Sequence, residues 1–148
     1  MPSEILTMMP VKILVIDDDP AMTELLDLLL KPRGFRVATS NKGEEGVQLV
    51  HQFRPDVIIL DLMMPGMDGW KVCQAVRTFS QVPILILSAL DGPGLVASAL
   101  DAGADDYLVK PVPSGVLVAH LNNLTRRGRS EKNNTQRSLT VEAEATAI

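Results

Sequence analysis

The stretch DVIILDLMMPGMDG, residues 56–69, decides the fold class of this chain. Its four consecutive aliphatic residues, 57–60, are typical of a strand that is buried on both faces, as strands in a parallel sheet are. The strand is followed by Asp61 and by a loop that contains proline and glycine. An isolated aspartate in such a loop is usually a turn residue. The place of Asp61 at the end of a buried strand instead indicates a functional carboxylate.

Short apolar runs of this kind alternate with helical patterns along most of the chain. We predict strands at residues 13–16, 35–38, 57–60, 84–87 and 107–109. We predict helices at residues 20–31, 43–53, 69–78, 95–102 and 113–127. Asp19 is a typical N-cap for the first of these helices, and Pro20 suits its first position. The alternation predicts an α/β fold built on a parallel sheet.

Length, charge and cysteine content limit the class of protein. The chain has 148 residues, a net charge of −4 and one cysteine, Cys73. We expect one domain over residues 10–127, which is long enough to bury a core, followed by a polar linker or C-terminal tail over residues 128–148. The lone cysteine and the absence of a bilayer-spanning apolar run predict a cytoplasmic protein without membrane contact. The negative charge argues against direct nucleic-acid binding.

Polar side chains follow four of the predicted strands, at the point where each strand ends. Asp17 and Asp18 follow the first strand, Asp61 the third, Ser88 the fourth and Lys110 the fifth. Right-handed crossovers between parallel strands bring such ends to one edge of the sheet. Crowded carboxylates repel one another unless a cation neutralises them, and oxygen ligands favour Mg²⁺. The sequence therefore predicts a magnesium site that can assist phosphoryl transfer to a nearby oxygen nucleophile.

Four motifs in this order resemble the response regulator receiver family of two-component signalling. They are ILVIDDDP (13–20), DVIILDLMMPGMDG (56–69), ILILSA (84–89) and GADDYLVKP (103–111). Each motif alone is weak, but the set is specific, and the resemblance covers residues 12–127. It implies a flavodoxin-like (βα)5 fold, which is a doubly wound five-stranded parallel sheet with strand order 2-1-3-4-5.

The resemblance also implies the chemistry of the site. Asp61 would accept a phosphoryl group from a sensor histidine kinase or a phosphotransfer protein. Mg²⁺ would be held by Asp17, Asp18, Asp61 and the backbone carbonyl of Met63. The chain would act as a signalling receiver that promotes its own phosphorylation and dephosphorylation, without a turnover substrate.

The remaining strand-end residues would form the switch. Ser88 and Lys110 would contact the phosphoryl oxygens, and the peptide bond from Lys110 to Pro111 would be cis. A new dianion at Asp61 gives Ser88 a strong acceptor, after which Tyr107 can turn inward. We expect this to rearrange the surface formed by the helix over 95–102, the strand over 107–109 and the helix over 113–127.

GADDYLVKP resembles the receiver subclass that carries a winged-helix DNA-binding domain and dimerises through this surface. Several charges of that subclass are missing, because residues 95–102 contain no lysine or arginine, and His120 and Asn122 replace basic residues. A homodimer through this surface is therefore left open. His120 has no carboxylate partner that the sequence makes evident. No winged-helix sequence follows within the 148 residues, so we expect a stand-alone receiver or part of a longer protein.

Three other classes of protein share part of this pattern. Asp17 to Asp19 also fit the D-x-D loop of haloacid dehalogenase-like phosphatases, but that class needs an acidic pair after the lysine, and Asp61 would stay unexplained. A flavodoxin-like FMN carrier shares the fold but needs a phosphate loop after the first strand, which is absent. A phosphorylation-independent receiver would not need the intact acidic pair, acceptor and lysine.

Overall fold

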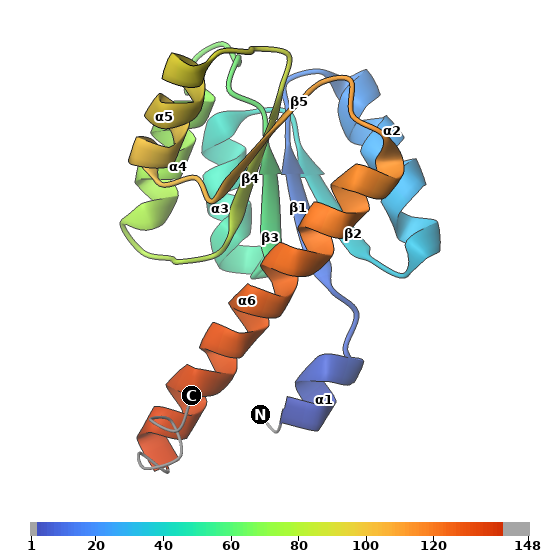
Figure 1. The fold of residues 1–148 in the computed structure, drawn as a ribbon, viewed down its shortest axis with the longest axis vertical. Coiled ribbons are helices and arrows are strands. Elements are labelled where there is room, and N and C mark those ends of the chain that lie inside the picture. Colours follow the sequence, from blue (N-terminus) through green and yellow to red (C-terminus); the bar gives the residue numbers. More distant parts are fainter. Residues whose placement is uncertain (1–2, 141–148) are drawn as a thin grey trace.

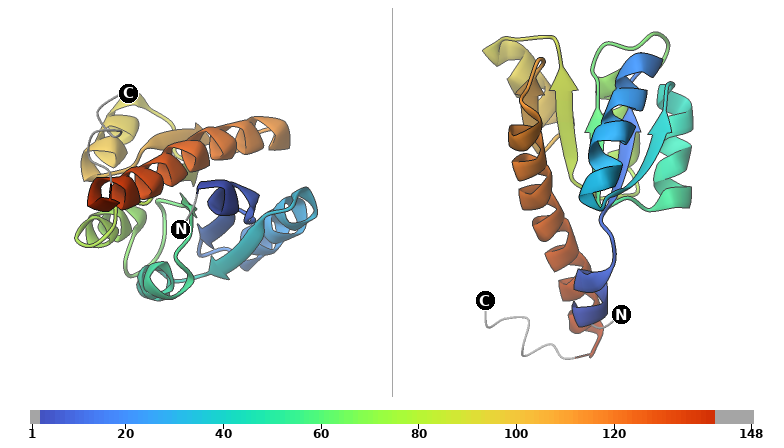
Figure 2. Two further views of the ribbon diagram at one scale, coloured as in Figure 1. Left: turned by 90° about the horizontal axis from the view of Figure 1, so that it is seen from below. Right: turned by 90° about the vertical axis from the view of Figure 1, so that its right-hand side faces the viewer.

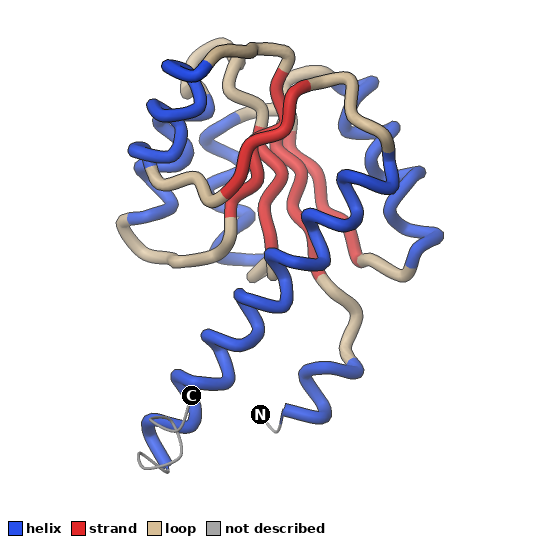
Figure 3. Tube along the Cα trace, in the orientation of Figure 1, coloured by secondary structure: helices blue, strands red, loops and turns tan. Residues whose placement is uncertain are grey.

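A computed structural model of the chain describes residues 3–140 and has an α/β architecture. Its strands form one parallel sheet in the order β2-β1-β3-β4-β5, as predicted (Figures 1 and 3). The strands are β1 (Lys12–Ile16), β2 (Arg36–Ser40), β3 (Val57–Leu60), β4 (Ile84–Ser88) and β5 (Asp106–Val109). Each predicted strand is present, with ends that differ by at most two residues, and β3 matches its predicted bounds.

The helices follow the predicted alternation and add one element at the N-terminal end. They are α1 (Ser3–Met8), α2 (Pro20–Leu30), α3 (Gly43–Phe53), α4 (Gly69–Arg77), α5 (Pro93–Ala102) and α6 (Ser114–Thr140). A short 3-10 helix, η1 (Lys31–Arg33), continues α2 and ends at Gly34, whose φ of 95° suits glycine. The predicted cap is also present, because Asp19 Oδ1 accepts a hydrogen bond from the Ala21 amide at 3.0 Å.

The core consists of two layers, one on each face of the sheet. Alternate residues of a strand point to opposite faces, so Leu14 and Ile16 pack with α3, α4 and α5, whereas Ile13 and Val15 pack with α2 and α6. All four of these β1 side chains have no exposed surface. Strand β1 is therefore covered on both faces, which explains its unbroken run of aliphatic residues.

The two ends of the described chain differ from the prediction. Helix α6, predicted to end at Arg127, continues to Thr140, and α1 lies beside its lower part (Figure 2). Gly128 packs closely against Pro83, and Arg129 donates a hydrogen bond to the Met9 carbonyl at 2.8 Å. These tertiary contacts support the helix just past residue 127, where its polar sequence has no apolar stripe of its own. The boundary at residue 127 stays a prediction, and residues 141–148 lie outside the described part.

Helix α6 is 27 residues long. Neither α6 nor any other helix within residues 3–140 is both long enough and apolar enough to cross a membrane.

The start of α4 is packed directly against the backbone that follows β3. A Cβ atom on Gly69 would lie 2.4 Å from the Asp61 carbonyl oxygen and 2.6 Å from the Leu62 Cα atom. Backbone atoms cannot move aside as a flexible side chain can, so we expect Gly69→Ala to lower the free energy of unfolding by about 1–3 kcal/mol. Urea unfolding measures this loss.

Gly115→Ala is the matched control. No atom lies within 4 Å of a Cβ on Gly115, which is in the first turn of α6. Alanine is favoured over glycine in a helix, so the free energy of unfolding should be unchanged or raised, by less than about 1 kcal/mol. Equal losses in both variants would contradict the close packing of α4 against the backbone of Asp61 and Leu62.

Candidate functional site

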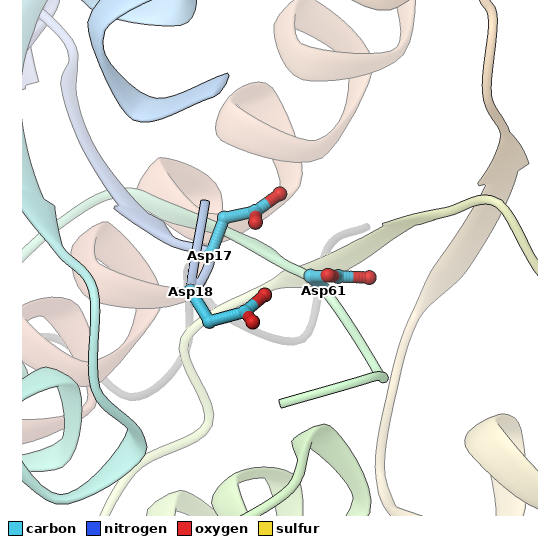
Figure 4. Close-up of side chains that lie close together, drawn as sticks. All are labelled: Asp17, Asp18 and Asp61. Carbon is cyan, nitrogen blue, oxygen red and sulfur yellow. The ribbon is translucent and has the colours of Figure 1, made fainter. Parts of the chain in front are cut away.

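Three carboxylates gather at the carboxyl ends of β1 and β3. These strands are neighbours, with Ile16 opposite Leu60, so the residues that follow them emerge side by side. The Asp61 amide continues the ladder with a hydrogen bond to the Ile16 carbonyl at 2.9 Å. Carboxylate oxygens of Asp17, Asp18 and Asp61 lie within 4.8 Å of one another and face a shared space (Figure 4).

The cluster is only partly open to solvent. Asp17 is 3% exposed and Asp61 is 8% exposed, whereas Asp18 is more accessible. Burial and the neighbouring Asp17 carboxylate raise the pKa of Asp61, and Asp18 adds to this effect. Lys110 and a hydrogen bond from the Met63 backbone act in the opposite direction and only partly offset the rise.

Lys110 reaches the cluster from the edge strand β5. It follows β5 at the edge, and its Nζ lies 2.9 Å from Asp17 Oδ2. The other oxygen of Asp17 accepts a hydrogen bond from the Asp19 amide at 3.0 Å. Protein donors thus contact both oxygens of Asp17, while Asp61 has no ion pair with a lysine or arginine among the described residues. The peptide bond from Lys110 to Pro111 is cis, as the family resemblance implied.

The donor set fits a hard divalent cation. Three carboxylates from two strand ends supply oxygen ligands with a net negative charge, which is the arrangement that Mg²⁺ and similar ions favour. The Met63 backbone amide donates a hydrogen bond to the Asp61 carboxylate. Asp19 caps α2, in agreement with its omission from the predicted ligands.

Ser88 and Tyr107 are linked to each other through Leu90. The Leu90 amide donates to the fully buried Ser88 Oγ at 3.2 Å, and the Tyr107 hydroxyl donates to the Leu90 carbonyl at 2.7 Å. Burial raises the pKa of Tyr107. In this structure the Tyr107 side chain is half-buried and already bonded.

Some interactions at the amino ends of β4 and β5, opposite the carboxylate cluster, were missed from the sequence. His120 Nδ1 lies 2.5 Å from Asp106 Oδ2, so this histidine does have a carboxylate partner. Asp105 pairs with Arg77 at 2.9 Å and receives the Ile84 amide at 2.8 Å. Both aspartates belong to the GADDYLVKP motif, but the motif alone does not reveal their partners. Asn41 was not identified from the sequence either, although its side chain donates a hydrogen bond to the carbonyl of Asp17, the first residue of the acidic loop (residues 17–19).

Comparison with known families matches this geometry to one of them. The family model described as "Response regulator receiver domain" matches residues 13–122, which is most of the chain. The chain belongs to the response regulator receiver family. Receivers are signalling domains, so the motifs identified in the sequence are those of a signal-transduction family rather than of the phosphatase or FMN-carrier alternatives.

Curated relatives of this receiver include transcriptional regulators. It is 45% identical over 119 residues to the transcriptional regulatory protein AfsQ1 of Streptomyces coelicolor, covering 80% of this chain and 53% of AfsQ1. It is 42% identical over 120 residues to the DNA-binding response regulator MtrA of Mycolicibacterium smegmatis, covering 81% and 53% of the two chains. The chain thus spans about half the length of these curated relatives.

Solved structures share the receiver fold. The BeF3-activated N-terminal receiver domain of Klebsiella pneumoniae RstA matches with a TM-score of 0.75 and 33% identity, over 78% of this chain and 98% of that one. Chemotaxis protein CheY4 of Vibrio cholerae matches with a TM-score of 0.74 and 32% identity, over the same shares. The predicted family and fold are therefore confirmed.

The charge of Asp61 should reduce stability at neutral pH. Because the pKa of Asp61 is raised by folding, the folded state binds its proton more tightly than the unfolded chain does. The resulting penalty is absent below the ordinary pKa of 3.8 and grows as the pH rises through the folded pKa. We expect Asp61→Asn to be more stable than wild type at pH 7 without Mg²⁺, with a difference that disappears toward pH 3.8.

Urea unfolding at several pH values, with a chelator present, tests this expectation. Asp101→Asn is the control, since Asp101 is exposed on α5 and outside the cluster. A stability difference for Asp61→Asn that does not change with pH, or one that the control reproduces, would show that electrostatic crowding is not the cause.

Proposed function

We propose that this receiver accepts a phosphoryl group on Asp61 in a Mg²⁺-dependent reaction, from a sensor histidine kinase or a phosphotransfer protein. The observation that carries the proposal is the position of Asp61. It lies at the end of a central strand, 8% exposed, within 4.8 Å of two further carboxylates and close to Lys110. A carboxylate that is buried beside two others destabilises the fold when it is charged, which favours a functional role, and its oxygen can act as a nucleophile.

Each residue of the site has a separate role in the proposed phosphoryl transfer. An Asp61 carboxylate oxygen attacks the phosphorus, the bond from phosphorus to the donor nitrogen breaks, and the leaving imidazole takes up a proton from solvent. Asp17, Asp18, Asp61 and the Met63 carbonyl would hold Mg²⁺, which when bound neutralises charge on the phosphoryl oxygens. Lys110 is 2.9 Å from Asp17 before the reaction and can turn to an incoming phosphoryl oxygen.

Leu90 gives the switch a physical connection. If the Ser88 hydroxyl turns to a phosphoryl oxygen on Asp61, its contact with the Leu90 amide is weakened. Tyr107 holds the carbonyl of the same Leu90, so a shift of this residue is transmitted to β5. The surface of α5, β5 and α6 would then change as the output of the switch. A further inward turn of Tyr107 stays a prediction.

The proposal also covers partners and location. The exposed Leu100 of α5 and Val116 of α6 lie on the surface through which we propose a homodimer. Two relatives are named as a transcriptional and a DNA-binding regulator, and we propose that this receiver itself makes no direct contact with nucleic acid. We further propose a cytoplasmic location and a signalling role without a turnover substrate.

Phosphorylation is tested by intact mass. Incubation with Mg²⁺ and acetyl phosphate should add one phosphoryl group to the wild type and none to Asp61→Asn, because the substitution removes the carboxylate that follows β3. Asp101→Asn should gain the same mass as wild type. Beryllofluoride should change the fluorescence of Trp70, which follows the site loop at the start of α4.

The outcomes differ clearly. A mass gain in Asp61→Asn would place the phosphoryl group on another residue. No gain and no beryllofluoride response in a folded, Mg²⁺-binding protein would contradict the receiver chemistry, and phosphatase turnover at Asp17 would be assayed next.

A further inference from the structure

Asn41, in the loop between β2 and α3, contacts the acidic loop with its side chain. Its Nδ2 donates to the Asp17 carbonyl at 2.8 Å and to Thr23 Oγ1 at 3.1 Å. A backbone carbonyl can only accept hydrogen bonds, so the NH2 end of the amide must face it. The two contacts join segments that are 24 and 18 residues away in the sequence.

The carbonyl of Asp17 is a sensitive point of the site. It belongs to the peptide group that links Asp17 to Asp18, and this group is planar. Fixing one atom of the plane restricts the direction in which both side chains leave the backbone. The other side of Asp17 is held as well, because its amide donates to the Ser40 carbonyl at 3.1 Å. Two consecutive residues, Ser40 and Asn41, therefore both form hydrogen bonds with Asp17, which is the first of the three consecutive aspartates 17–19.

We propose that Asn41 is a positioning residue for the Mg²⁺ site, which orients the peptide plane between Asp17 and Asp18 without touching the metal. Three crowded carboxylates repel one another, and a loop of three consecutive aspartates can relieve the repulsion by turning away from Asp61. Asn41 opposes that turn before the cation binds. The inference rests on the proposed function of the site and adds a residue to it.

Thr23 sets the orientation of Asn41. Its side chain is 4% exposed, and its hydroxyl donates to the Pro20 carbonyl at 3.1 Å while it accepts from Asn41. The first turn of α2, fixed by its proline, thus aligns the amide that holds Asp17. If so, Thr23→Ser should keep the alignment, because serine retains the hydroxyl, and Thr23→Val should lose it.

The experiment compares Asn41→Ala, Thr23→Val, Thr23→Ser and the double variant Asn41→Ala/Thr23→Val with wild type. Gln48→Ala is the matched control, since it removes an exposed amide from the neighbouring helix α3. Mg²⁺ affinity is measured by calorimetry, and amide exchange of Asp18 and Asp19 is measured without Mg²⁺. Urea unfolding without Mg²⁺ separates loop order from global stability.

We expect Asn41→Ala to weaken Mg²⁺ binding about three- to tenfold, the effect of losing one or two modest hydrogen bonds. Exchange at Asp18 and Asp19 should become faster in the same variant, with urea unfolding nearly unchanged. Thr23→Ser should bind Mg²⁺ as wild type does, and Thr23→Val should bind more weakly. The double variant should be no weaker than Asn41→Ala alone, because both changes remove one contact chain.

Other results would overturn the inference. Binding by Asn41→Ala within twofold of wild type, equal losses in Thr23→Ser and Thr23→Val, or a loss that the Gln48→Ala control reproduces would each remove the positioning role. If wild type accepts the phosphoryl group normally, only the role of Asn41 has failed. If wild type neither binds Mg²⁺ nor accepts the group, the proposed function is wrong, and the role of Asn41 falls with it.

Discussion

Electrostatic repulsion between carboxylates at one edge of the sheet is the constraint on which the rest of the site depends. The ladder between β1 and β3 places Asp17 beside Asp61, and the register cannot slip without moving every buried side chain of the strands. Repulsion therefore has to be met locally, by a lysine from β5, by hydrogen bonds to the carboxylates and by a cation. Each of these groups enters from a different strand or loop. The sheet is consequently the rigid support that functional groups require, and the loops supply the chemistry.

This constraint also explains why the site can act as a switch. Asp61 lies among groups that only partly stabilise its charge, so a change in that charge alters the balance for all of them. Ser88 is fully buried and tied to Leu90, which Tyr107 also holds. The route from Ser88 to β5 is hydrogen-bonded throughout, and it is the route by which the proposed acceptor, Asp61, would act. A better-compensated carboxylate would be more stable and would transmit less.

Much of the fold and the acidic site was predictable because the signals are local or topological. Unbroken aliphatic runs mark strands covered on both faces, and parallel topology alone brings their ends together. The interactions that were missed pair groups distant in sequence: His120 with Asp106, Asn41 with Asp17, and Arg129 with Met9. Such pairs have no periodicity that marks them. The extension of α6 was missed for the same reason, since its polar sequence has no apolar stripe and the contacts just past residue 127 are with distant residues.

The two ends of β3 separate burial from function. Asp56 precedes the strand and Asp61 follows it, and both are nearly buried, with 4% and 8% of their surfaces exposed. Asp56 accepts the Lys12 amide at 2.9 Å and lies 3.6 Å from Arg129, whose guanidinium also binds the Met9 carbonyl. Asp61 instead faces two other carboxylates, and the nearby Lys110 is paired with Asp17. A buried aspartate that has its own cationic partner, such as Asp56, contributes to the structure. A buried aspartate whose nearby cation is already paired with a neighbouring carboxylate favours the binding of a further cation. This difference in charge compensation, more than burial itself, distinguishes the carboxyl edge of the sheet as the candidate functional site.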